Sequence, residues 1–200
     1  IADGDNKNKS SKLNNLQKKI IYEQFSEISK ISEIENLIKN QIVDKMYLIY
    51  LIDGVKKDLK KVHIKSQREL VNYAYLVAGT VGLMMSKVLG AQNTYAERFA
   101  IDLGIAMQIT NIARDIVEDN KRNRNYISSN FETIKGTLKL ADKFYDNSFK
   151  SINEISLNNR FAILVARRVY RQIGNKILTK KNIENYRISG KIYVTNFGKI

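Results

Sequence analysis

The chain has no proline in 200 residues, and this feature limits its fold more than any other. Proline interrupts helix interiors, so its complete absence favours long helices. The spacing of apolar residues agrees, because leucine and isoleucine recur every three to four residues, as on one helix face. Examples are Leu13, Leu16, Ile20 and Ile21, and then Ile31, Ile34, Leu37 and Ile38. The sequence therefore predicts an all-α protein.

Helices are predicted over residues 13–28, 31–51, 67–90, 94–120, 132–153 and 158–179. Polar stretches join them, and the tail around Lys191–Thr195 is expected to be extended. No repeat or low-complexity linker divides the chain, so residues 1–200 are expected to form a single domain. Because the chain opens without a methionine and runs at once into a hydrophilic stretch, we expect the first helices of the fold to be missing.

The chain carries 34 Lys and Arg against 20 Asp and Glu, a net charge of +14. This excess suggests an anionic partner such as nucleic acid, anionic lipid or a polyphosphate. Lysine is abundant throughout, however, so solvated lysine faces explain most of the excess. Residues 160–200 stand out, with ten Lys and Arg and one acid, Glu184.

Two classes of protein are excluded or disfavoured by composition. The absence of cysteine excludes disulfide scaffolds and cysteine-ligated metal centres. The longest apolar run, Tyr73–Met85, is too short to span a membrane as a helix, and no signal peptide opens the chain. We therefore expect a cytoplasmic protein.

The segment Gln108–Asp119 carries a row of oxygen-bearing side chains. Gln108, Asn111, Asp115 and Asp119 are separated by three, four and four residues, which places them on one face of a helix. Two carboxylates one turn apart repel each other, so a cation is expected beside them. Mg²⁺ suits such a row, since it prefers oxygen and is often held by carboxylates together with substrate phosphates.

A surface role for these aspartates is the alternative. Asp-x-x-x-Asp spacings are common on exposed helices, where Arg114, Lys121 or Arg122 would pair with the carboxylates. The preceding segment 100–112 is apolar and contains small residues, which favours a buried helix on which unpaired charge is costly.

The apolar segment Tyr73–Met85 contains Gly79 and Gly82 within a helical pattern. Each glycine costs a helix about 1 kcal/mol relative to alanine. Either the helix is kinked or approached closely by a ligand here, or the glycines allow close packing of a neighbouring helix. The pattern does not choose between these interpretations.

Three segments together resemble the squalene/phytoene synthase family, and the bacterial phytoene synthases within it most of all. They are Tyr73–Met85, Asp102–Asp119 and Arg124–Ile127. The resemblance implies the isoprenoid-synthase fold, a helical bundle around a central cavity, with roughly the first third of a member absent. Two aspartate-rich motifs would face each other across Mg²⁺ ions that hold the diphosphates of two prenyl substrates.

The resemblance also implies roles for individual residues. Asp115 and Asp119 match the second aspartate-rich motif, and Asp3 matches the last aspartate of the first. The implied metal ligands are Asp3, Asn111, Asp115 and Asp119. Tyr73 matches a tyrosine placed near the developing carbocation and joins Asp115 and Asp119 as a catalytic residue. The implied substrate-binding residues are Gln108, Arg114, Arg124, Tyr126, Tyr170 and Lys191. The family pattern is altered at Ala74, Asn123 and Ser128, none of which is an implied metal ligand.

The implied reaction is the Mg²⁺-dependent head-to-head condensation of two geranylgeranyl diphosphates, through prephytoene diphosphate, to phytoene, a step of carotenoid biosynthesis. Mn²⁺ is an alternative metal, and NADPH is not expected for a phytoene synthase. Leu76, Val77, Val81, Met84 and Met107 are expected to line the dry cavity.

Several alternatives stay open. A squalene, dehydrosqualene or presqualene diphosphate synthase would use farnesyl diphosphate instead. Outside enzymes, a catalytically dead scaffold or a basic nucleic-acid-binding helical protein is the rival, although the acidic row would repel nucleic acid and no such partner is expected. The basic C-terminal segment predicts weak peripheral association with the inner membrane face.

Overall fold

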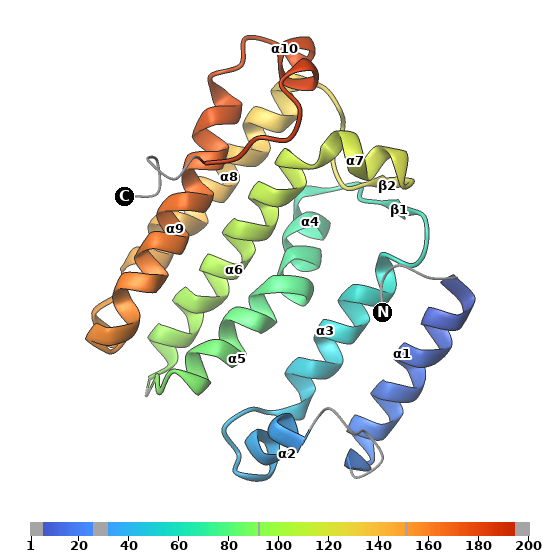
Figure 1. Cartoon of the computed structure of the whole chain (residues 1–200), viewed down its shortest axis with the longest axis vertical. Coiled ribbons are helices and arrows are strands. Elements are labelled where there is room, and N and C mark those ends of the chain that lie inside the picture. The colour runs from blue at the N-terminus through green and yellow to red at the C-terminus, as the bar shows by residue number, and fades with distance from the viewer. Residues whose placement is uncertain (1–5, 26–31, 92, 151, 195–200) are drawn as a thin grey trace.

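In this computed structural model the described residues are 6–25, 32–91, 93–150 and 152–194, and almost all of their regular structure is helical (Figure 1). The helices are α1 (Asn6–Ile21), α2 (Ser32–Lys39), α3 (Lys45–Lys57), α4 (Gln67–Ala74), the π-helical η2 (Tyr75–Gly79), α5 (Thr80–Val88), α6 (Thr94–Arg114), α7 (Ile116–Lys121), α8 (Phe131–Phe149), the 3₁₀ turn η3 (Ile152–Glu154), α9 (Leu157–Leu178) and α10 (Ile183–Ile188). Two short strands, β1 (Val62–His63) and β2 (Arg124–Asn125), pair in parallel. The all-α prediction is confirmed.

Polar side chains, not prolines, mark where several helices begin. The carboxylate of Asp44 accepts the N–H of Met46 at 2.8 Å at the start of α3. Asn93, Asn130 and Asn182 cap α6, α8 and α10 in the same way. Each such cap stabilises its helix by about 1 kcal/mol. These caps explain where the chain can leave one helix and begin another.

Two predicted helices have different bounds in the structure. The single helix expected over 31–51 is wrong, because Asp44 caps a new helix and Gln41, just before it, has a φ of 56°. The helix expected over 13–28 is instead α1, which begins earlier and ends at Ile21, before Glu23 with a φ of 56°. Residues 26–31 lie outside the described residues. The predicted helices near 132–153 and 158–179 correspond to α8 and α9.

The helix predicted over 67–90 forms as one helical stretch, α4–η2–α5, with a π-helical segment inside it. Close packing is the reason for two glycines: a Cβ on Gly82 would collide with the carbonyl oxygen of Ala100, and one on Gly104 with that of Ala78. The backbones of α5 and η2 therefore touch the backbone of α6. Of the two interpretations of this segment, close helix packing holds at Gly82.

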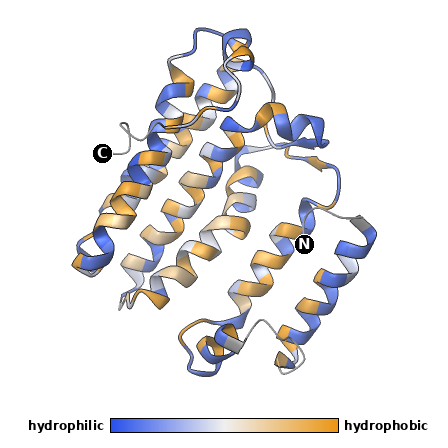
Figure 2. Cartoon of the chain, in the orientation of Figure 1, coloured by the Kyte–Doolittle hydropathy of each residue, from blue (hydrophilic) through white to orange (hydrophobic). Residues whose placement is uncertain are grey.

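Helix α6 is the centre of the fold, since it packs against η2, α5, α8 and α9 (Figure 1). Most helices carry both hydrophobic and hydrophilic residues along their length, as expected for helices with one buried face (Figure 2). On α6, Ile105 and Ile109 are buried against Ala141 and Tyr145 of α8. Helices α1 and α3 enclose a separate apolar cluster that includes Leu13 and other residues.

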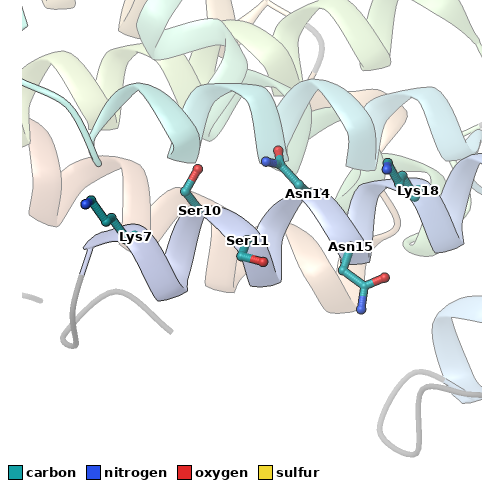
Figure 3. Close-up of a pocket in the computed structure, with 6 residues that line it drawn as sticks. All are labelled: Lys7, Ser10, Ser11, Asn14, Asn15 and Lys18. Carbon is teal, nitrogen blue, oxygen red and sulfur yellow. The ribbon is translucent and has the colours of Figure 1, made fainter.

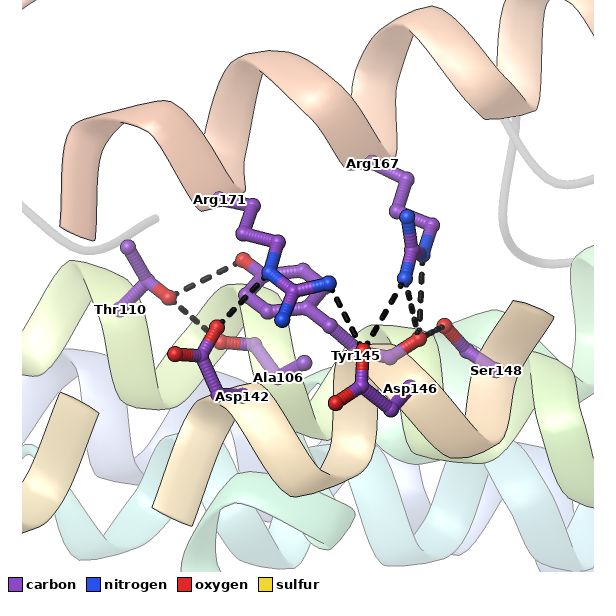
Figure 4. A network of polar contacts seen from close by, with 8 residues as sticks. All are labelled: Ala106, Thr110, Asp142, Tyr145, Asp146, Ser148, Arg167 and Arg171. Atoms are coloured by element: carbon purple, nitrogen blue, oxygen red, sulfur yellow. Dashed lines mark hydrogen bonds and ion pairs between the residues drawn. The ribbon is translucent and has the colours of Figure 1, made fainter. Parts of the chain in front are cut away.

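A polar network ties α9 to α8 and α6 (Figure 4). Arg171 donates to the carboxylates of Asp142 at 2.8 Å and Asp146 at 2.7 Å, and Arg167 donates to the carbonyl oxygen of Tyr145 at 3.0 Å. The Tyr145 hydroxyl in turn lies 3.0 Å from that of Thr110 on α6. The network fixes α9 beside α6, where the two helices form walls of a groove.

The C-terminal tail has no regular structure over the described residues 191–194, but it is anchored. Ile192 and Val194 are buried in the same apolar cluster as Ala113 and Ile116, at the end of α6. None of the helices over the described residues is both long enough and apolar enough to cross a membrane.

Candidate functional site

An apolar groove of about 430 Å³ runs along α6, between α5 and α9. Most of its wall is aliphatic, but Gln108 and Asn111 lie at the C-terminal end of the part of α6 that lines it, and Tyr170 reaches it from α9. The groove therefore joins a long apolar wall to a few polar groups, the usual composition of a site for an amphiphilic ligand.

The predicted lining of the groove is partly right. Val77, Val81 and Met107 line it, whereas Leu76 and Met84 do not. Helix α3 packs against this part of η2, since a Cβ on Gly54 would collide with both Leu76 and Val77. Helix periodicity alone does not show which of two neighbouring helices an apolar side chain will meet.

The row of oxygen-bearing side chains continues from the groove across a break in the helix. A single helix over 94–120 was predicted, and this is wrong at Asp115, which has a φ of −101° and a ψ of 14° and separates α6 from α7. The N–H of Asp115 nevertheless donates to the Asn111 carbonyl at 2.8 Å, and the N–H of Asp119 to the Asp115 carbonyl at 2.9 Å. The row therefore keeps its order along the chain.

A distant tyrosine contacts the backbone at the break. The hydroxyl of Tyr186 on α10 donates to the carbonyl oxygens of Ala113 at 2.8 Å and Arg114 at 2.5 Å. These are among the last carbonyls of α6, which a helix end leaves without partners of its own. A residue more than 70 positions away in sequence thus bonds carbonyls at the end of α6.

Asp115 is held by the protein's own cations. Nε and Nη2 of Arg114 donate to its two carboxylate oxygens at 2.7 and 2.6 Å, and Nζ of Lys191 lies 3.1 Å from Oδ1. Burial opposes ionisation, but Arg114 and Lys191 outweigh it and hold the pKa of the Asp115 carboxyl below its usual value. Of the predicted surface partners, Arg114 is therefore correct, although the pair is half-buried.

Asp119 is in the opposite electrostatic state. Among the described residues its carboxylate has no ion-pair or hydrogen-bond partner, and only the more distant charges of Arg124 and Arg122 favour its ionisation. Burial, followed by the charges of Asp115 and Asp58, raises the pKa of Asp119 to about 6. The charge of Asp115 is therefore neutralised by Arg114 and Lys191, whereas that of Asp119 is not neutralised by a paired side chain among the described residues.

Tyr73 and Tyr126 lie in a buried cluster with Asp58, apart from the residues that line the groove. The hydroxyl of Tyr73 is 2.9 Å from both carboxylate oxygens of Asp58, and that of Tyr126 donates to Asp58 Oδ1 at 2.7 Å. The two rings stack with centroids 4.9 Å apart. Burial and the charge of Asp58 raise the pKa of the Tyr73 phenol far above its usual value, so it stays protonated.

The structure thus distributes the predicted site residues over three neighbouring places. Asn111, Arg114, Asp115, Asp119 and Lys191 meet at the α6–α7 break, and the charge of Arg124 reaches Asp119 from β2. Gln108 and Tyr170 are in the groove, and Tyr73 and Tyr126 are in the Asp58 cluster. Asp3 lies outside the described residues.

The sequence was compared with those of known proteins. A family model described as squalene/phytoene synthase matches residues 2–131. The chloroplastic phytoene synthase of an Oncidium hybrid cultivar is 33% identical over 175 residues, which cover 73% of this chain and 42% of that protein. The 15-cis-phytoene synthase of Enterobacter agglomerans is 30% identical over 146 residues, covering 62% and 50%.

The chain belongs to the squalene/phytoene synthase family. The match of the squalene/phytoene synthase model to residues 2–131 covers more than half of the 200 residues, which establishes the membership. The chain spans between 38% and 53% of the length of the curated relatives it matches. The residues matched by the family model include the oxygen-bearing row and the α5 and α6 walls of the groove, whereas the α9 wall lies beyond residue 131.

Two solved structures have a similar fold. A crystal structure of a dehydrosqualene synthase in complex with ligand superimposes with a TM-score of 0.78 at 22% identity, over 98% of this chain and 76% of that one. A squalene synthase from Alicyclobacillus acidocaldarius gives a TM-score of 0.67 at 15% identity, over 76% and 65%. The fold is therefore the isoprenoid-synthase helical bundle of these squalene/phytoene synthase family structures.

The oxygen atoms at the break suit a hard divalent cation. Oδ1 of Asn111 is buried and has no hydrogen-bond partner among the described residues, which costs about 1–3 kcal/mol unless a ligand satisfies it. Asn111, Asp115 and Asp119 all offer oxygen, the donor that Mg²⁺ prefers. No group of three or more His, Cys, Asp or Glu over the described ranges is arranged to hold a metal by itself. A cation here would need further oxygens, such as those of a diphosphate.

Another hollow, along α1, lacks these properties. It is lined by polar side chains of that one helix, namely Lys7, Ser10, Ser11, Asn14, Asn15 and Lys18 (Figure 3). It contains neither a carboxylate nor an apolar wall. The α1 hollow is therefore a poor site for an amphiphilic ligand or a metal ion, and the groove on α6 is the better one.

Two residues of the site were missed from the sequence. Asp58 stands between lysines in the run Lys56–Lys61, which is typical of a solvated loop. Tyr186 lies in a polar stretch that was expected to be a connection. Only the tertiary structure brings either residue to this part of the squalene/phytoene synthase fold.

Proposed function

We propose that the protein containing this chain is a prenyltransferase, a phytoene synthase that joins two geranylgeranyl diphosphates head to head through prephytoene diphosphate. Curated relatives at about 30% identity are named phytoene synthases, which supports this choice of substrate and product. The alternative is a dehydrosqualene or squalene synthase acting on farnesyl diphosphate, the two kinds of enzyme among the structural relatives.

One juxtaposition carries the proposal. Asn111 lines the apolar groove and, one helical turn further along the chain, Asp115 begins the charged part of the row. A prenyl diphosphate has the matching division, with a hydrocarbon tail for the groove and an anionic head for the α6–α7 break.

Asn111, Asp115 and Asp119, with Asp3 from the first motif, would hold Mg²⁺, or Mn²⁺ in its place. When bound, the ion would neutralise the charge of the leaving diphosphate. NADPH is not expected, because phytoene formation includes no hydride reduction.

The chain's own residues would supply the rest of the environment. Arg114, Arg124 and Lys191 place positive charge around the break and would bind the diphosphate oxygens. Gln108 and Tyr170 line the groove next to the break and would orient the head group. The aliphatic walls would exclude water from the reacting carbons. The family role of Tyr73, near the developing carbocation, would place that cation beside the Asp58 cluster and not among the residues that line the groove, because Asp58 holds Tyr73 there.

Product analysis tests this proposal. The complete protein that carries this chain is incubated with Mg²⁺ and either geranylgeranyl or farnesyl diphosphate, and both pyrophosphate release and the hydrocarbon product are measured. We expect C20 substrate to give phytoene and Asp115→Ala to abolish turnover, with Glu33→Ala on exposed α2 as control. Turnover of C15 substrate only would favour the alternative, and turnover unaffected by Asp115→Ala would refute the active site.

Weak binding to membranes is a second part of the proposal. The excess of Lys and Arg over residues 160–200 would attract anionic lipid, where greasy substrates and products are stored. Co-sedimentation with anionic vesicles, but less with neutral ones, is expected. Equal background sedimentation with both would remove this part and leave the enzymatic part unaffected.

A further inference from the structure

Tyr186 makes a contact that no sequence motif predicts. It lies on α10, is only 3% exposed, and packs in the apolar cluster that contains Ala113, Ile116 and Ile192. Its hydroxyl reaches the carbonyl oxygens of Ala113 at 2.8 Å and Arg114 at 2.5 Å. The ring therefore serves the core, while the hydroxyl serves the backbone at the α6–α7 break.

The break matters because it allows Arg114 to pair with its neighbour. On a regular helix the side chains of residues i and i+1 diverge and do not face each other. Arg114 and Asp115 nevertheless form a bidentate pair, with Nε–Oδ1 at 2.7 Å and Nη2–Oδ2 at 2.6 Å. Such a pair needs Asp115 to leave the helical conformation, and its φ of −101° and ψ of 14° show that it does.

The Tyr186 hydroxyl stabilises this departure. In an uninterrupted helix the carbonyls of Ala113 and Arg114 would accept the N–H groups of Val117 and Glu118. The single O–H of Tyr186 lies within hydrogen-bonding distance of both carbonyl oxygens and is shared between them in place of those amides. Without it, these buried carbonyls would be satisfied best by a straight helix, which would turn Asp115 away from Arg114 and change its position relative to Asn111 and Asp119.

We infer that Tyr186 is a positioning residue, whose hydroxyl holds the α6–α7 break and thereby sets the arrangement of Asn111, Asp115 and Asp119 for cation and diphosphate binding. This inference rests on the proposed function, since it assigns a role in that same site. Tyr186 acts through the backbone. Among the described residues its hydroxyl bonds two carbonyl oxygens and neither the Asp115 nor the Asp119 carboxylate.

The test compares two tyrosine-to-phenylalanine variants. Tyr186→Phe removes the hydroxyl at the break, and Tyr145→Phe is the matched control. Tyr145 is also buried, at 1% exposure, and its hydroxyl bonds Thr110 and not the break. Both variants keep the ring in the core and lose one buried hydroxyl with its hydrogen bonds, so similar losses of thermal stability are expected.

Binding of Mn²⁺ in the presence of inorganic pyrophosphate is then measured by electron paramagnetic resonance, well below the unfolding temperature of each variant. We expect Tyr186→Phe to weaken Mn²⁺ binding by about threefold or more, and Tyr145→Phe to leave it within experimental error. Unchanged affinity in Tyr186→Phe, or equal weakening in both variants, would overturn the inference. So would a Tyr186→Phe protein that is unfolded where Tyr145→Phe is folded, because the hydroxyl would then serve the fold.

The wild-type titration separates this inference from the proposed function. If wild-type protein binds no Mn²⁺ with pyrophosphate, the proposed metal site itself fails and the positioning role with it. If wild type binds and Tyr186→Phe binds equally well, only the positioning role fails.

Discussion

Nζ of Lys191 lies 3.1 Å from Oδ1 of Asp115, so an ammonium group from the C-terminal tail pairs with a carboxylate that is expected to bind the metal. Arg114 holds the same carboxylate from the other side. Asp119, one turn further on, has no such cation and keeps a pKa raised to about 6. The two aspartates of one motif therefore start from different states: a metal ion must compete for Asp115, whereas Asp119 is free to receive it.

The first prediction concerns that competition. Lys191→Ala should raise the affinity for Mn²⁺ without pyrophosphate by about two- to fivefold, because a partly exposed ion pair of this kind contributes about 0.2–1 kcal/mol. The same variant should bind inorganic pyrophosphate more weakly. Calorimetric titration checks both, with Lys181→Ala as the exposed control and Lys191→Arg to retain the charge. A Lys191→Ala protein with unchanged Mn²⁺ affinity would show that the ion pair does not compete with the metal.

The second prediction concerns the stability of the metal-free protein. The pKa of Asp119 is raised from 3.8 to about 6 in the folded state, so folding is penalised when this group ionises. The penalty is absent below pH 3.8, grows as the pH rises towards 6, and is complete above it. Asp119→Asn should therefore stabilise the protein in EDTA at pH 8 by about 1 kcal/mol, discounted for partial exposure of the carboxylate.

Thermal unfolding at several pH values measures this effect. A gain of 1 kcal/mol corresponds to roughly 3 °C in a chain of this size. The gain should shrink as the pH falls from 8 to 4.5. A constant difference across this range would mean that the charge of Asp119 is not its cause.

Local spacing predicted the oxygen-bearing row but not its shape. The intervals between Gln108, Asn111, Asp115 and Asp119 are fixed by helix geometry, which acts over a few residues, and the backbone bonds across Asp115 preserve them. The break itself depends on Tyr186, and the surroundings of Tyr73 depend on Asp58, which lies 15 residues away in sequence. These contacts form only when distant segments pack, so no local pattern could reveal them.

The same limit applies to the bounds of helices. Helix α9 was predicted to within a residue at each end, because its helical pattern is long and no capping or turn signal interrupts it. The division between α2 and α3 depends on a single side chain, since the Asp44 carboxylate accepts an amide hydrogen and starts a new helix. Periodicity continues across such a cap and hides it.

The third prediction concerns Asp58. Asp58→Ala removes the acceptor for two buried phenols, those of Tyr73 and Tyr126. The two hydroxyls lie 3.1 Å apart, so one can donate to the other and a single buried donor is left unsatisfied, which predicts a loss of about 1–3 kcal/mol in chemical denaturation. Asp53→Ala in α3, the helix that Asp58 follows, is the control, and as its side chain is half exposed it should change stability by less than about 0.5 kcal/mol. Equal effects of the two substitutions would contradict the role of the Asp58 cluster.

The fourth prediction concerns the contact between η2 and α6 beneath the groove. Gly104→Ala places a methyl group against the carbonyl oxygen of Ala78, so the two backbones must separate. We expect a loss of about 1–3 kcal/mol, the usual cost of overpacking, together with a widened groove. Gly136→Ala in α8 is the matched control, because nothing lies within 4 Å of the added methyl group. There alanine should stabilise the helix by up to about 1 kcal/mol. Opposite signs for the same substitution in the two helices would identify the backbone contact as the cause. Stabilisation at both positions would show that α6 can move away from η2 without cost.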